Sequence, residues 1–178
     1  MYKSIETLKT EHRSIENLLT TLEHAIKKLQ QNQQIDINAT KELINVIMEA
    51  DQCHHGKEED IFFVELEKRG IPKENGPIGV MLYEHQYLRK LRKIIEDNID
   101  KVNENQESKS NFISTATEFI EILTNHILKE DNVLFKFAEN VLDNDIDQKM
   151  YEEFTKVHLG HSCPHCLNKK AQKLYNKI

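Results

Sequence analysis

Two copies of a His-x-x-x-Glu motif place an imidazole and a carboxylate four residues apart: His54 with Glu58, and His126 with Glu130. Because residues four apart on an α-helix are neighbours on one face, each motif presents both groups side by side. The two carboxylates could together bridge one pair of metal ions. Imidazole and carboxylate with open coordination positions suit iron better than the thiolate sets that are typical of structural zinc. The motifs therefore indicate a dinuclear metal site and favour iron.

Two more histidines stand where apolar side chains are expected. Over residues 3–31, apolar residues recur at alternating steps of three and four, which predicts a long amphipathic helix. His12 fills the one position that interrupts this pattern. A similar apolar pattern over about 75–103 contains His85 in the same way. Both histidines are therefore expected to face the interior of a helical protein.

The two motifs lie on two further predicted helices. One begins at a cap formed by Asp36 or Asn38 and runs to about residue 69, and the other begins near Ser108 or Ser110 and runs to about residue 142. In both, the apolar pattern continues through the motif. The histidine and the glutamate of each motif are therefore predicted to point inward.

The sequence repeats itself once. Residues 11–15 (EHRSI) resemble 84–88 (EHQYL), and residues 54–63 (HHGKEEDIFF) resemble 126–135 (HILKEDNVLF). The two histidines of the first half are 42 residues apart and those of the second half 41. Two helical hairpins related in this way, with short connections, predict an all-α fold, an up-down four-helix bundle.

The predicted helices bring the ionisable residues to one level of this bundle. At a rise of about 1.5 Å per residue, the four interior histidines fall near one layer. Glu58 and Glu130 in that layer would each cost on the order of several kcal/mol unless a cation compensates them. Singly, each histidine could be a satisfied core residue and each motif a solvated helix face. Their coincidence favours a pair of metal ions over a bundle without metal.

The motif can be read in a second register, because His55 with Glu59 also has the four-residue spacing and His126 with Asp131 has a spacing of five. We prefer Glu58 and Glu130 as the bridging residues, since aligning the two halves on KEE and KED also aligns their apolar residues. Glu59 and Asp131 then become candidates to support the ligands. His55 is predicted to point about 100° away from His54, toward solvent or a supporting position, and His24 lies about 18 Å along its helix from His12.

Through the two His-x-x-x-Glu motifs and the interior histidines His12 and His85, the chain resembles the hemerythrin-like, HHE cation-binding domain family. The resemblance covers roughly residues 3–142. It implies a non-haem diiron bundle, whose members carry or sense dioxygen, handle nitric oxide or peroxide, or help repair iron–sulfur centres. The implied cofactor is two iron ions with an oxo or hydroxo bridge. The predicted metal ligands are His12, His54, Glu58, His85, His126 and Glu130.

The chain departs from the oxygen-carrying members of that family. They have a fifth histidine one turn along the third helix, where this chain has Arg89, and Met81 lies four residues on the other side of His85. Four imidazoles, two carboxylates and a bridge give each iron five donors and an open position. We therefore expect a protein that senses or reacts with a small oxidant, with an iron donor or storage module assisting iron–sulfur repair as the alternative. No catalytic residue is assigned.

A helical extension over residues 144–178, following the bundle domain at 1–143, carries a second group of metal-binding side chains. Three histidines and two cysteines lie within nine residues: His158, His161, Cys163, His165 and Cys166. The Cys-x-x-Cys spacing allows a zinc site, a redox-responsive dithiol, or a reduced tail without a role. The remaining cysteine, Cys53, is expected to be a small buried packing residue.

The overall composition excludes several classes of function. The net charge is −6 and the basic residues are spread along the chain, so no basic face is available for nucleic acid. The longest apolar run, residues 78–83, falls far short of the ~18 residues of a membrane span, and the first twelve residues contain no secretory signal. We expect a cytoplasmic protein whose partner is a small diatomic or peroxide ligand, with a redox or iron-acceptor protein as a further partner.

Overall fold

The described part of the chain is entirely helical. The structure, a computed structural model, describes residues 2–157 and 164–178, and within these ranges it contains helices and no strand. The elements are α1 (Lys3–Gln30), α2 (Ile37–Lys57), η1 (Glu58–Phe62), α3 (Phe63–Lys68), α4 (Pro77–Ile99), α5 (Gln106–Lys129), η2 (Glu130–Leu134), α6 (Phe135–Val141), α7 (Asn144–Phe154) and α8 (Pro164–Tyr175). The predicted all-α class is confirmed.

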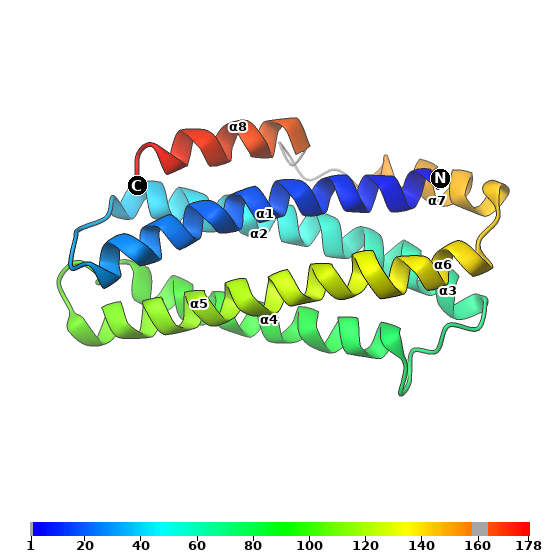
Figure 1. Cartoon of the computed structure of the whole chain (residues 1–178), viewed down its shortest axis with the longest axis horizontal. Coiled ribbons are helices and arrows are strands. Elements are labelled where there is room, and N and C mark those ends of the chain that lie inside the picture. The colour runs from blue at the N-terminus through cyan, green and yellow to red at the C-terminus, as the bar shows by residue number, and fades with distance from the viewer. Residues whose placement is uncertain (1, 158–163) are drawn as a thin grey trace.

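Four long helical segments lie alongside one another and run the length of the molecule (Figure 1). They are α1, the continuous segment α2–η1–α3, α4, and the continuous segment α5–η2–α6. Successive segments run in opposite directions, as the colours in Figure 1 show. The two remaining helices cover the outside: α7 packs against α1 and η1, and α8 packs against α1 and α2. Each predicted site residue is therefore carried by one of the four long segments.

The helix ends follow local capping chemistry. The Asp36 side chain accepts a hydrogen bond from the Ala39 backbone N–H, so Asp36 is the cap of α2. Asn105 caps α5 by accepting from the Ser108 N–H, so this helix begins at Gln106, earlier than predicted. Gly70 adopts a φ of +89° just after α3, a conformation that glycine adopts without steric cost.

The apolar pattern predicts that the second and fourth long helices are regular α-helices throughout, and the structure differs from this prediction. Each contains one π-helical turn, and the two turns begin at the two motif glutamates. The Phe63 N–H donates to the Glu58 carbonyl and the Phe135 N–H donates to the Glu130 carbonyl, each spanning five residues. Such turns insert one residue into an α-helix and occur frequently at functional sites.

The apolar core is divided into two clusters by the layer of ionisable residues. On α1, for example, Leu8 belongs to one cluster and Ile15 to the other, with His12 between them. On the fourth segment, Ile127 and Leu134 are separated in the same way by Glu130. The site is therefore enclosed between apolar layers, which excludes water and raises the cost of any uncompensated charge there.

Helix α7 is joined to the start of α1 by a buried carboxylate. Asp147 accepts hydrogen bonds from the backbone N–H groups of Lys3 and Ser4, at 2.8 and 2.9 Å, and from the Ser4 hydroxyl. Tyr2, the residue that precedes α1, makes no side-chain cap, so Asp147 performs this role from a distant segment.

We expect Asp147→Ala to lower the free energy of unfolding by about 1–2 kcal/mol, as loss of a helix cap does. The measurement is a urea titration followed by circular dichroism. Asp145→Ala is the control because Asp145 is exposed on the same helix. Equal stability of the two variants would show that the Asp147 contacts are not stabilising.

Candidate metal centre

The structure brings the six predicted ligands together in one buried layer. Each is at most 2% exposed: His12, His54, Glu58, His85, His126 and Glu130. They come from α1, α2, η1, α4, α5 and η2 respectively. The four long helical segments each contribute at least one of these side chains, so the layer forms only when all four are packed.

The two glutamates lie between histidines of different helices. Glu58 has one carboxylate oxygen 3.1 Å from His54 Nε2 and the other 3.5 Å from His85 Nε2. Glu130 Oε2 lies 3.2 Å from His12 Nε2 and 3.4 Å from His126 Nε2. Glu58 thus spans the layer with its two oxygens, as a bridging ligand does, whereas Glu130 reaches two histidines with a single oxygen.

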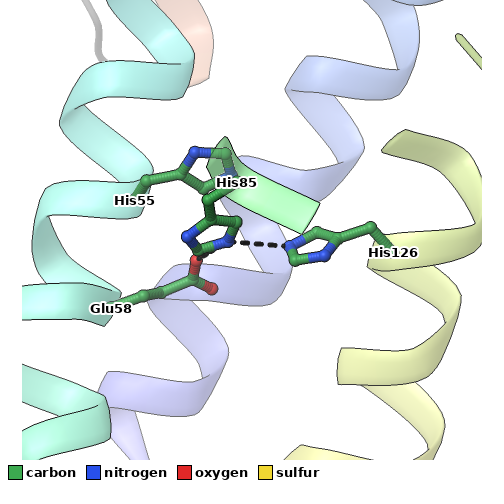
Figure 2. A group of neighbouring side chains, drawn as sticks. All are labelled: His55, Glu58, His85 and His126. Atoms are coloured by element: carbon green, nitrogen blue, oxygen red, sulfur yellow. Dashed lines mark hydrogen bonds and ion pairs between the residues drawn. The ribbon is translucent and has the colours of Figure 1, made fainter. Parts of the chain in front are cut away.

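Two groups of potential ligand atoms result, each within 4.8 Å of one another. One group consists of His12, His54, Glu58 and Glu130, and the other of His55, Glu58, His85 and His126. Glu58 belongs to both groups. Figure 2 shows the second group, in which the three rings and the Glu58 carboxylate converge.

Of the two positions predicted for His55, solvent or a supporting position beside the ligands, the structure excludes solvent. Its side chain is 1% exposed and its ring stacks on that of His85 with a centroid distance of 3.5 Å, instead of facing solvent. The physical reason is that α2 packs against both α1 and α4. Successive residues differ by about 100° around a helix, so one can face each neighbour. His54 faces Glu11 on α1, and His55 faces His85 on α4.

Carboxylates on the outer side of the layer orient the histidine rings. Four ring Nδ1 atoms lie 2.7–2.9 Å from a carboxylate oxygen: His12 from Asp131, His54 from Glu11, His85 from Glu59 and His126 from Glu84. Such a partner keeps the proton on Nδ1 and leaves Nε2 to face a metal. Glu59 and Asp131 occupy the supporting positions predicted for them. Glu11 and Glu84 were missed, although the repeated Glu-His dipeptide was a signal for them.

Each of these four carboxylates also pairs with a cation. Lys57 pairs with Glu11, Lys129 with Glu84, Arg13 with Asp131 and Arg89 with Glu59. Partial burial alone would raise the pKa of Glu59, but hydrogen bonds from His85 and Arg89 lower it to about 2. Arg89, at the position where oxygen carriers have a histidine, thus helps to hold the Glu59 carboxylate against His85.

The innermost atoms lack the partners that buried polar groups require. His12 Nε2, His54 Nε2 and both carboxylate oxygens of Glu58 and Glu130 are buried without a hydrogen-bond partner. His85 Nε2 and His126 Nε2 face each other at 3.0 Å (Figure 2), and each ring has its Nδ1 against a carboxylate. Two nitrogen lone pairs that face each other at this distance repel unless a cation lies between them. Two imidazole nitrogens that bind the same metal ion at about 2.1 Å, with a right angle between the two bonds, are about 3.0 Å apart. The residues therefore fit metal ions.

The electrostatics of the layer lead to the same conclusion. Among the described residues, Glu58 and Glu130 have no Lys or Arg within ion-pair distance and approach only imidazoles. Burial would raise the pKa of Glu130, but the charges of His126 and His12 lower it far below its usual range. Burial would lower the pKa of His54, but the Glu58 charge and Glu11 raise it well above its usual value. Without metal the layer therefore attracts protons, and metal binding displaces them.

Removing one outer carboxylate should weaken metal binding without breaking the fold. We choose Glu84→Ala because its partner Lys129 is 41% exposed and can be solvated after the change, whereas Lys57 beside Glu11 is buried. We expect metal affinity to fall about 10- to 100-fold, measured by competition with a chelator. Glu118→Ala, which removes only an exposed contact to Tyr87, should leave it unchanged. Equal affinities would mean that Glu84 does not support His126.

The other sequence predictions have different outcomes. His24 lies outside the layer and stacks on Tyr175 of α8 at 4.3 Å. Cys53 is buried, as predicted, and its thiol donates to the Val157 carbonyl at 3.4 Å. In the C-terminal Cys/His group, residues 158–163 and the side chain of His165 lie outside the described part of the chain. The zinc and dithiol hypotheses therefore stay predictions.

Comparison with known protein families identifies one matching family model. The model of the Hemerythrin HHE cation binding domain matches residues 3–138. A search of curated proteins found no significant match. Within the described part of the chain, the helices lack the combination of length and hydropathy that crossing a membrane requires.

Proposed function

Since the chain belongs to the hemerythrin HHE cation-binding domain family, we propose that it is a non-haem diiron protein that binds a small oxidant, namely dioxygen, nitric oxide or peroxide. The ligands are the six residues predicted from the sequence: His12, His54, Glu58, His85, His126 and Glu130. The observation that supports this most directly is Glu58, which is fully buried, has no hydrogen-bond partner for either oxygen and belongs to both ligand groups.

Bound iron would supply one-electron redox chemistry and a coordination position for the small molecule. The chain itself supplies three further conditions. The apolar clusters on both sides exclude water, and the outer carboxylates keep the ring protons on Nδ1. The close packing of the layer leaves no room for a large substrate, since every ligand is at most 2% exposed. These conditions favour a ligand of two or a few atoms.

The position of His55 changes the donor count on which the expectation of sensing rested. With four imidazole ligands, each iron keeps an open coordination position. A fifth imidazole would fill the open position of one iron and leave that of the other iron free, which is the arrangement that a dioxygen carrier needs. We therefore place reversible dioxygen binding beside sensing and turnover as a role of this centre.

The deciding experiment is metal analysis of protein purified without added metal, with optical spectra in both oxidation states. We expect about two iron ions per chain and a spectrum that changes on exposure of the reduced protein to dioxygen, nitric oxide or peroxide. Stable, reversible oxygenation would indicate that the protein carries dioxygen, and irreversible oxidation would indicate sensing or enzymatic turnover. Protein that contains another metal, or none, would contradict the proposal.

The iron-donor alternative is disfavoured by burial. Because the ligands belong to four packed helical segments and are almost fully buried, iron could leave only when the bundle opens. We therefore expect reduced protein to keep its iron for hours in the presence of a chelator. Release within minutes would favour donation.

A further inference from the structure

The outer ring of the site follows the internal repeat closely. Glu11 with Lys57 supports His54, and Glu84 with Lys129 supports the equivalent histidine of the second half. Asp131 with Arg13 and Glu59 with Arg89 form a second matched pair of supports. Each of the four carboxylates in this ring therefore has a counterpart at the equivalent position of the other half, whereas Arg13 and Arg89 do not occupy equivalent positions of the repeat.

His55 and Asp51 break this symmetry. The offset between the second and fourth helices is 72 residues, so the counterpart of His55 is Ile127 and the counterpart of Asp51 is Leu123. Ile127 and Leu123 are buried members of the apolar core. His55 and Asp51 are as well buried as these apolar residues, with 1% and 6% exposure. The fold thus accepts an apolar pair at this position, and the first half has a costly polar pair instead.

The polar pair is directed into one half of the metal layer. Asp51 Oδ1 lies 3.1 Å from His55 Nδ1, and among the described residues no Lys or Arg lies within ion-pair distance of Asp51. On its inner side, the His55 ring lies against His85 and approaches His126 with a centroid distance of 5.7 Å (Figure 2). An anionic carboxylate on the outer side of a histidine makes its ring a stronger metal ligand.

The geometry points to His55 as a fifth nitrogen ligand, oriented by Asp51 and supplied by the second helix, which makes the two metal positions unequal. This inference rests on the proposed function. The position formed by His55, His85, His126 and Glu58 has three imidazoles. Glu130 Oε2 also lies 3.4 Å from His126 Nε2, so with Glu130 and the proposed oxo or hydroxo bridge this position has six donors and holds its ion more tightly. The position formed by His12, His54, Glu58 and Glu130 has two imidazoles and, with the same bridge, five donors, so it is the one at which an added ligand binds.

The test is the double variant Asp51→Leu/His55→Ile, which copies Leu123 and Ile127 from the second half. Replacing both residues avoids leaving a buried carboxylate unpaired, and the other half of the fold already packs this pair. His24→Ala is the matched control, because His24 is a histidine of α1 that lies outside the metal layer. Circular dichroism and thermal unfolding verify that each variant folds.

The first measurement is a titration of the metal-stripped chain with Co²⁺, followed by visible absorption. We expect two phases in the wild type and in His24→Ala, with dissociation constants at least about tenfold apart. Removing only a group that supports a ligand already weakens metal binding by about tenfold or more, so a difference of one whole imidazole ligand should have at least this effect. We expect the double variant to show one phase. A single phase in the wild type, or two unchanged phases in the double variant, would overturn the inference.

The second measurement uses azide as the added ligand on iron-loaded protein. We expect one azide per pair of irons in the wild type and two in the double variant, and an unchanged stoichiometry of one would overturn the inference. If the purified protein contains no iron and cannot be loaded with it, the proposed diiron function fails. The Co²⁺ titration still decides whether the two positions are unequal.

Discussion

Replacing Glu58 with alanine is expected to abolish the binding of both metal ions. Glu58 is the residue shared by the two ligand groups, and its two oxygens approach histidines of different helices. Its loss removes one donor from each position and also one of the two buried negative charges that attract the cations. We expect the metal content, measured by mass spectrometry after purification, to fall from about two ions per chain to nearly none.

Two comparisons make this prediction specific. Glu139→Ala, an exposed glutamate on α6, should keep the full metal content. Glu130→Ala should keep more metal than Glu58→Ala, because Glu58 directs one oxygen toward each ligand group, whereas Glu130 makes both of its histidine contacts with a single oxygen. Retention of two ions by Glu58→Ala would show that this carboxylate does not bridge the site.

Removing the metal from the wild-type protein is expected to destabilise the fold strongly. A ligand at a thousand times its dissociation constant contributes about 4 kcal/mol of stability. For a chain of 150–250 residues, that lowers the midpoint of thermal unfolding by about 8–16 °C when the ligand is removed. The loss should approach this size here, because after stripping Glu58 and Glu130 are compensated only by the protons that the buried histidines take up. Differential scanning calorimetry before and after treatment with a chelator measures it.

The matched variant is Glu58→Gln/Glu130→Gln, which removes both buried charges and preserves their shape. A chelator should leave its midpoint unchanged, and it should be at least as stable as the stripped wild type. If stripping does not change the wild-type midpoint, the layer is held by its own hydrogen bonds. In that case, the alternative of a structural bundle without metal, in which His54→Ala with Glu130→Ala leaves stability unharmed, would be correct.

Local pattern was sufficient to predict most of the residues of the layer. The apolar spacing identified His12 and His85 as interior residues, and the motif spacing did so for Glu58 and Glu130. These predictions depend only on helical periodicity, which determines the face that each side chain occupies. The break into π-helical turns at the two glutamates could not be predicted, because the apolar pattern continues through both turns.

The sequence by itself determined the all-α class, the internal repeat and the inward direction of the four histidines and two glutamates. Only the tertiary structure decided that His55 joins them and which outer carboxylate supports each ring. The reason is that a helix between two neighbours has two buried faces about 100° apart, and the sequence pattern cannot tell a second buried face from a solvated one. Partners such as Glu11 with His54 come from different helices, so their contact depends on how the helices are placed side by side.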